Sequence, residues 1–169
     1  MSTERRRIVS DTGPLISLEK LTGGFRLISR LYDVVLVPPA VLKELMQGQF
    51  ESTEAYLVHY NVVDLLEVKD VSSSSVHAKT RHLDEGESQA IQLAIDEELP
   101  LLIEEQAGRE TAQELGLHVS GIAGQLTRGF REGLISVDEA KGKLDEMLRA
   151  GRINIKVHEI VAKAIENEA

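Results

Sequence analysis

The sequence predicts an α/β protein whose parallel sheet is covered by helices on both faces. Short apolar segments alternate along the chain with amphipathic ones, and this alternation is typical of the strand–helix–strand units that build a parallel sheet. The segment 34–37 is rich in β-branched residues, as expected of a strand that is buried on both faces. From residue 121 onward only helical patterns remain, so we expect a helical C-terminal extension.

The segment 8–16 is the stretch around which the predicted fold is organised. A run of strand formers ends at Asp11, and Thr12, Gly13 and Pro14 then turn the chain toward a helix. Ligands of open α/β sheets bind beyond the carboxyl ends of the strands. Asp11 is therefore expected to point into a binding site, with the Thr12 hydroxyl beside it. A role of Asp11 and Thr12 as a simple helix cap explains this stretch equally well.

Hydrophobic periodicity and turn residues predict the remaining elements. Strands are expected at 34–37, 61–68, 99–103 and 117–119. Helices are expected at 14–19, 25–32, 40–47, 51–59, from 84 onward, and at 107–115, 122–131, 136–150 and 157–168. The polar connector 71–80, with four consecutive serines, is expected to be the most flexible loop. We expect one domain over 1–169, with a core at 7–135 and the helices of 136–169 packed on it.

Composition excludes several classes of protein. The net charge of -9 argues against a nonspecific basic nucleic-acid binder, but it is compatible with an acidic metal-binding cleft. The chain has no cysteine, which excludes disulfides and thiolate metal sites. The sequence contains neither a signal peptide nor an apolar run of about 18 residues that could span a membrane. We therefore expect a cytoplasmic protein without a membrane partner.

Four carboxylates occupy strand ends or helix starts, where a site is expected. They are Asp11, Glu44, Glu87 and Glu105. Hard divalent ions such as Mg²⁺ bind a few carboxylates together with waters and substrate phosphate, and such ions can activate water for attack on a phosphodiester. Each acid also has an ordinary explanation: Glu87, for example, lies three residues after Asp84 and fits a capping box. Spacing alone does not show that the four converge.

Four segments resemble the PIN domain family when they are taken together and in order. They are SDTGPLI at 10–16, VPPAVLKEL at 37–45, LDEGESQAI at 83–91 and LLIEEQAGR at 101–109. More narrowly, they are similar to a bacterial and archaeal PIN-like branch that is related to the VapC-type toxins. The resemblance spans about residues 7–135. It implies a three-layer α/β/α sandwich and an endoribonuclease that depends on Mg²⁺ or Mn²⁺.

The resemblance also implies roles for individual residues. It places the site acids at Asp11, Glu44, Glu87 and Glu105, with Thr12 as the adjoining hydroxyl. PIN domains more often carry Asp at the third and fourth of these positions. The longer Glu side chain displaces the carboxylate, and catalytic geometry tolerates only about half an ångström of displacement. Arg109 is expected either to contact substrate phosphate or to pair with Glu105 on the helix surface.

Partners and alternatives remain open at this point. A toxin would act on RNA and would be blocked by an antitoxin protein. The family also often forms homodimers. The tail offers Leu144, Met147 and Leu148 for dimer contacts, although packing within the chain explains these residues equally well. The first alternative is a PIN-like interaction module that has lost catalysis. The second is a flavodoxin-like or response-regulator-like domain. Receiver domains normally carry a lysine at the end of a late strand, and this sequence offers no good candidate for it.

Overall fold

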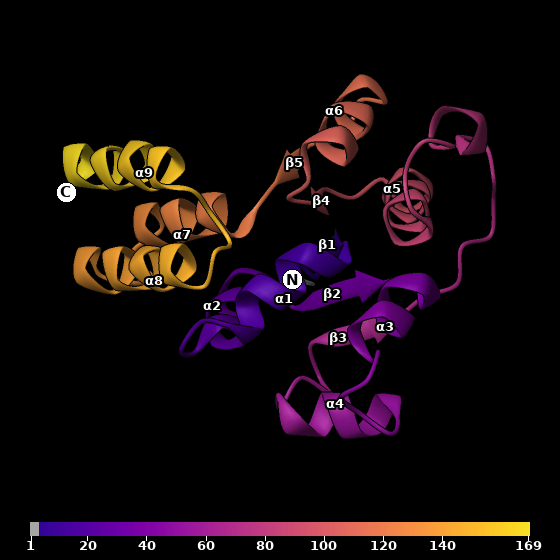
Figure 1. The fold of residues 1–169 in the computed structure, drawn as a ribbon, viewed down its shortest axis with the longest axis horizontal. Helices are drawn as coiled ribbons and strands as arrows, with labels where there is room; N and C mark the ends of the chain where they lie inside the picture. The colour runs from indigo at the N-terminus through magenta and orange to yellow at the C-terminus, as the bar shows by residue number, and fades with distance from the viewer. Residues whose placement is uncertain (1–3) are drawn as a thin grey trace.

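The structure is a computed structural model that describes residues 4–169. In this part of the chain β1 (Arg7–Ser10), β2 (Val34–Val37), β3 (Leu66–Val68), β4 (Leu101–Leu102) and β5 (Val119–Ser120) form one sheet. The strand order is β3-β2-β1-β4-β5, and every pair is parallel. The expected parallel α/β sheet is confirmed (Figure 1).

The helices follow the strands along the chain. They are α1 (Thr12–Glu19), α2 (Gly24–Leu31), α3 (Pro39–Leu45), α4 (Thr53–His59), α5 (Glu85–Glu97), α6 (Gln106–Glu114), α7 (Ile122–Arg131), α8 (Val137–Arg149) and α9 (Ile155–Glu168), with a short 3₁₀ helix at His77–Lys79. Among the residues described, no helix has both the length and the apolar character that crossing a bilayer requires.

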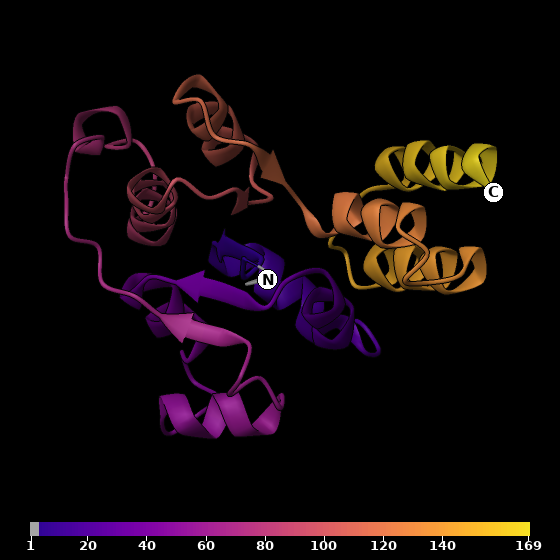
Figure 2. The ribbon, with the colours of Figure 1, turned by 180° about the vertical axis from the view of Figure 1, so that it is seen from behind.

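The order in which successive strands are added to the sheet reverses: β2 and β3 lie on one side of β1, and β4 and β5 lie on the other. The connections from β1 to β3 build the sheet one way, and the connections from β3 through β4 to β5 build it the other way. Because parallel crossovers are right-handed, helices of the two halves cover opposite faces, which gives the three-layer sandwich. The ribbon views show α5 and α6 apart from α2 and α4 (Figures 1 and 2). Ligands of open sheets bind at the carboxyl ends of the strands where the order reverses; here these are β1 and β4, and we call this place the strand crevice.

The centre of the sheet is fully enclosed. All four residues of β2 are buried, and Val9 of β1 pairs in register with Leu101 of β4. The turn between α1 and α2 is so tight that Gly24 lies directly against the Leu18 carbonyl of α1, and no Cβ fits there. This close contact fixes how α2 follows α1.

The three C-terminal helices lie side by side at one end of the molecule (Figures 1 and 2). α7 contacts both α1 and α2, so this bundle is attached to the sandwich. Leu144 and Met147 are completely buried within the chain. Packing inside the protein therefore accounts for both side chains, and neither is available for a dimer contact. Ser136 caps α8 by accepting a hydrogen bond from the Glu139 backbone N–H.

Three strands differ from the prediction, and the strand expected at 99–103 is only Leu101–Leu102. The strand expected at 61–68 is only Leu66–Val68, because Val62 and Leu65 close a turn through a backbone hydrogen bond. The strand expected at 117–119 is Val119–Ser120. The polar connector 71–80 is anchored on α5 by Gln92, whose amide donates to Ser73 and Ser75 and accepts from the Val76 N–H.

Candidate active site

Asp11 lies at the carboxyl end of β1 with only 5% of its surface exposed. It occupies the N-cap position of α1 in an extended conformation, but its side chain makes no capping hydrogen bond. One carboxylate oxygen, Oδ1, is buried without a hydrogen-bond partner among the residues described. Buried polar atoms are rarely left unpaired, and each such atom calls for an explanation. Helix capping therefore does not account for this side chain.

Glu44 is held beside the start of α1 by Thr12. The Thr12 hydroxyl donates to Glu44 Oε2 at 2.6 Å, a contact between α1 and α3. On its other side Glu44 meets Gly86, where a Cβ would overlap Oε1. Because Gly86 lies in the first turn of α5, the half-buried Glu44 in the last turn of α3 bridges the starts of α1 and α5. The Thr12 hydroxyl thus positions a carboxylate and does not cap its own helix.

The two carboxylate oxygens of Glu87 differ in their surroundings. Its Oε2 accepts from the Asp84 backbone N–H, and Asp84 Oδ1 accepts from the Glu87 N–H, which completes the predicted capping box. Its Oε1 is buried and has no partner within residues 4–169. α6 approaches this oxygen closely at Gly108, where a Cβ would lie 3.2 Å away. The cap explains one oxygen of Glu87 and leaves the other unexplained.

The predicted acids are close enough to perturb one another. Burial raises the pKa of Asp11 to about 7; the neighbouring Thr12 N–H opposes the rise, and the negative charges of Glu87, Asp84 and Glu44 add to it. Burial likewise raises the pKa of Glu87 to about 7, with Asp84 and Glu105 contributing through their negative charge. Perturbed carboxylates gathered at a crevice are a physical signature of functional sites.

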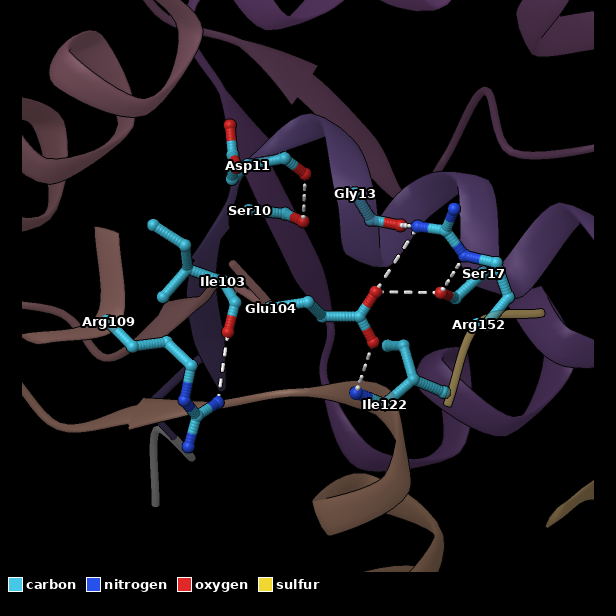
Figure 3. Close-up of polar contacts among 9 residues, drawn as sticks. All are labelled: Ser10, Asp11, Gly13, Ser17, Ile103, Glu104, Arg109, Ile122 and Arg152. Atoms are coloured by element: carbon cyan, nitrogen blue, oxygen red, sulfur yellow. Dashed lines mark hydrogen bonds and ion pairs between the residues drawn. The ribbon is translucent and has the colours of Figure 1, made fainter. Parts of the chain in front are cut away.

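The two adjacent acids after β4 point to different surroundings. Glu105 is exposed at the N-cap of α6 and makes no capping hydrogen bond. Glu104 points inward: its Oε1 accepts from the Ser17 hydroxyl at 2.7 Å, and its Oε2 accepts from the Ile122 N–H at 3.2 Å (Figure 3). In the same view the Asp11 carboxylate points away from this network. Glu104 therefore ties β4 to α1 and α7.

Two arginines flank Glu104 from opposite sides (Figure 3). Arg152 comes from the loop between α8 and α9 and lies 3.5 Å from Glu104 Oε1; it also donates to the Ser17 hydroxyl and to the Gly13 carbonyl. Arg109 donates to the Ile103 carbonyl at 3.0 Å. The expected ion pair between Arg109 and Glu105 is absent from the part of the chain described, and this alternative was wrong.

Sequence reasoning missed the roles of Ser17, Glu104 and Arg152. Glu104 carried a signal, because it is the first polar residue after a buried apolar run. Arg152 carried none, since it reaches the strand edge from the far end of the chain through contacts that no local pattern encodes. Ser17 lies inside a short helix and had no distinguishing neighbour in the sequence.

The donor set fits a hard divalent cation in chemistry. Carboxylate oxygens are the ligands that Mg²⁺ and Mn²⁺ prefer, and Asp11 Oδ1 and Glu87 Oε1 are buried carboxylate oxygens without partners. As arranged within residues 4–169, however, no group of three or more His, Asp or Glu side chains is placed to hold a metal ion. Asp11 and Glu87 each offer one unpaired carboxylate oxygen, and Asp84 and Glu44 lie close enough to Asp11 for their charge to raise its pKa.

Comparison with known proteins found one family match. A family model described as a PIN domain matches residues 7–167. The match covers nearly the whole chain and extends beyond the expected 7–135 to include α8, α9 and Arg152. No curated protein matches the chain.

Proposed function

The chain belongs to the PIN domain family, and we propose on this basis that it is an endoribonuclease dependent on Mg²⁺ or Mn²⁺. PIN domains are generally nucleases, and they typically use divalent metals. The observation that carries the proposal is the pair of buried, unpartnered carboxylate oxygens on Asp11 and Glu87 at the strand crevice. Bringing a cation next to these oxygens would compensate a desolvation cost that raises the pKa of both groups.

We assign the chemistry to residues as follows. Asp11 and Glu87 would hold the ion, and Glu44 would join them in the orientation imposed by the Thr12 hydroxyl. Glu105, exposed at the rim, faces the incoming strand and interacts with Glu87 through its charge. A bound divalent ion supplies Lewis-acid stabilisation of the phosphate and an activated water. The protein's own contribution is to keep the carboxylates of Asp11 and Glu87 buried beside Glu44.

Metal binding tests the proposal directly. Titration calorimetry with Mn²⁺ and with Mg²⁺ is carried out on the wild type, on Asp11→Asn and on Asp70→Asn, an exposed acid outside the site. We expect millimolar or tighter binding by the wild type and by Asp70→Asn, and none by folded Asp11→Asn. Heat released equally by all three proteins would place the ion elsewhere and contradict the assignment. Cleavage of RNA by the metal-loaded protein then tests the reaction itself.

We extend the proposal to a toxin of a toxin–antitoxin pair, in which an antitoxin protein covers the acidic crevice, and to a homodimer. Overproduction of the wild type should then arrest growth, whereas Asp11→Asn should not. Light scattering of the purified protein gives the number of subunits. Normal growth with active wild-type nuclease present would argue against the toxin role, and a monomeric mass would argue against the dimer.

A catalytically degraded interaction module is the second candidate. One observation favours it: the acids of residues 4–169 do not form a group of three that is placed for a metal ion. The longer Glu side chain at the fourth predicted position, which is exposed, fits the same interpretation. Metal binding separates the two candidates, because a degraded module is folded but binds no metal at concentrations that a nuclease would bind.

A further inference from the structure

A groove of about 680 Å³ opens beside Glu104, on the side away from the Asp11 carboxylate. It lies between the start of α7 and the loop that joins α8 to α9. Three charged side chains line it, Glu104, Arg109 and Arg152. With one carboxylate and two guanidinium groups, the groove carries a net positive charge on a protein whose total charge is -9. This contrast marks the groove as a site for an anion.

Both arginines keep hydrogen-bond donors free. Arg109 uses Nη1 for the Ile103 carbonyl, and Arg152 uses Nε and Nη2 for Ser17 and Gly13. No hydrogen bond within the described chain engages Nη1 of Arg152, or Nε and Nη2 of Arg109. Guanidinium groups bind phosphate oxygens through paired N–H donors, and both groups are already fixed in place by backbone contacts. They are preorganised for an anionic ligand.

The shape of the groove suits an extended chain rather than a single small anion. Its floor includes Gly121 and Gly124, which place no side chain in the space. Gly124 is exposed, and a Cβ there would meet only the Ser120 side chain, at 3.7 Å. Val119 and Val157 add apolar side chains to the same lining. Cationic donors together with apolar side chains match the alternating phosphates and sugars of a nucleic-acid strand.

A backbone contact at Gly13 links one arginine of the groove to the start of α1. The Gly13 carbonyl accepts from Arg152, and Gly13 is only two residues beyond Asp11. A cluster of carboxylates repels a polyanion, so an RNA strand needs cationic contacts on either side of the acids. An acidic protein segment would satisfy the arginines equally well, but it would gain nothing from adjacency to the acids.

We propose that this groove binds the phosphodiester backbone of single-stranded RNA next to the bond that is cleaved, with Arg109 and Arg152 contacting phosphate oxygens. The proposal rests on the proposed endoribonuclease function, and it names the path of the substrate. It also gives the C-terminal helices a role, because they place Arg152 at the groove. The groove binds phosphate through direct contacts and without a metal ion.

Filling the groove tests the proposal with little risk to folding. Gly124→Leu places a side chain in the groove from an exposed helical position, where leucine is a better helix former than glycine. Gly142→Leu is the matched control, because Gly142 is also exposed and helical, with open space around it. The readout is the fluorescence anisotropy of a fluorescein-labelled oligouridylate at low salt in EDTA, where neither metal nor cleavage contributes.

We expect Gly124→Leu to weaken oligouridylate binding at least about tenfold, the value of one lost charged contact, while Gly142→Leu binds as the wild type does. Arg109→Gln should reduce the slope of log K against log salt by about 0.7, the value for one phosphate contact on a single strand. Arg26→Gln, which removes an exposed arginine from another face, should leave affinity and slope nearly unchanged.

Several results would overturn the proposal. Equal affinities of the wild type and Gly124→Leu would leave an acidic protein segment as the occupant, and so would failure of the wild type to bind the oligouridylate at low salt. The test is independent of the metal site. If RNA binding is sensitive to Gly124→Leu but calorimetry detects no metal, the groove proposal stands and the nuclease proposal falls. If calorimetry detects metal but RNA binding is insensitive to Gly124→Leu, the nuclease proposal stands and the groove proposal falls.

Discussion

Replacing Asp11 by Asn should stabilise the protein in the absence of metal. Burial and neighbouring acids raise the pKa of Asp11 from its ordinary value of 3.8 to about 7. Each tenfold change in proton affinity corresponds to about 1.36 kcal/mol, so ionised Asp11 costs the folded state about 4 kcal/mol at pH 8 as an upper limit. Asn removes the charge but leaves buried amide hydrogens, which cost about 1–3 kcal/mol when they are unpaired. The expected net gain is about 1–3 kcal/mol.

The pH dependence gives this prediction a second signature. Between about pH 4 and 7 the folded state binds a proton at Asp11 that the unfolded state has released. Stability therefore falls as pH rises through this range and levels off above it. Asp11→Asn should flatten this fall, leaving only the part due to Glu87, whose pKa is also raised to about 7. The two groups interact, so their contributions do not simply add.

Urea unfolding at pH 5 and pH 8 in EDTA measures both effects. The wild type should lose stability between the two pH values, whereas Asp11→Asn should lose less and should exceed the wild type at pH 8. The exposed acid in the control variant Asp70→Asn should leave both curves in place. An Asp11→Asn variant that is less stable than the wild type at pH 8 would refute the reasoning, because the carboxylate would then be stabilised by contacts that the structure does not contain.

Three further predictions follow from the same geometry. Gly86→Ala should weaken Mn²⁺ binding by displacing Glu44, measured by calorimetry, yet alter the unfolding free energy by no more than about 1 kcal/mol, because only the end of a flexible side chain must move. Arg152→Gln should cost about 1–3 kcal/mol in urea unfolding, because Glu104 loses its ion pair while remaining largely enclosed. Mn²⁺ affinity should rise with pH up to about 7 and then level off, since protons compete for the two buried acids.

The alternation of strands and helices was predictable because the strands of a parallel sheet, buried on both faces, are continuous apolar segments. Val34–Val37 was predicted to the residue, since a continuous apolar run between Asp33 and two prolines has few other interpretations. The strand at 61–68 was overextended because Val62 and Leu65 are both buried, although they close a turn. Buried positions are occupied by apolar residues in turns as well as in strands, and hydrophobic periodicity over a few residues does not distinguish the two.

The surroundings of the site were less predictable than its acids. Asp11 and Glu44 are placed by local elements, the end of a strand and the short helix that follows two prolines, and local sequence patterns predict both elements. Glu104 differs, because its partners Ser17 and Arg152 lie 87 residues before it and far beyond it in the chain. Nothing in their local sequence specifies that contact; it follows from how α1, β4 and the α8–α9 loop pack together.

Glu87 shows why an ordinary explanation does not exclude a functional one. The capping box predicted from its spacing is present, and taken alone it would account for the residue. A carboxylate has two oxygens, however, and the cap uses Oε2 while Oε1 stays buried and unpaired. The cap fixes the side-chain conformation, so it holds the second oxygen in the crevice without any further support. A residue that stabilises a helix start is in this way also preorganised as a ligand, and the same contact serves both purposes.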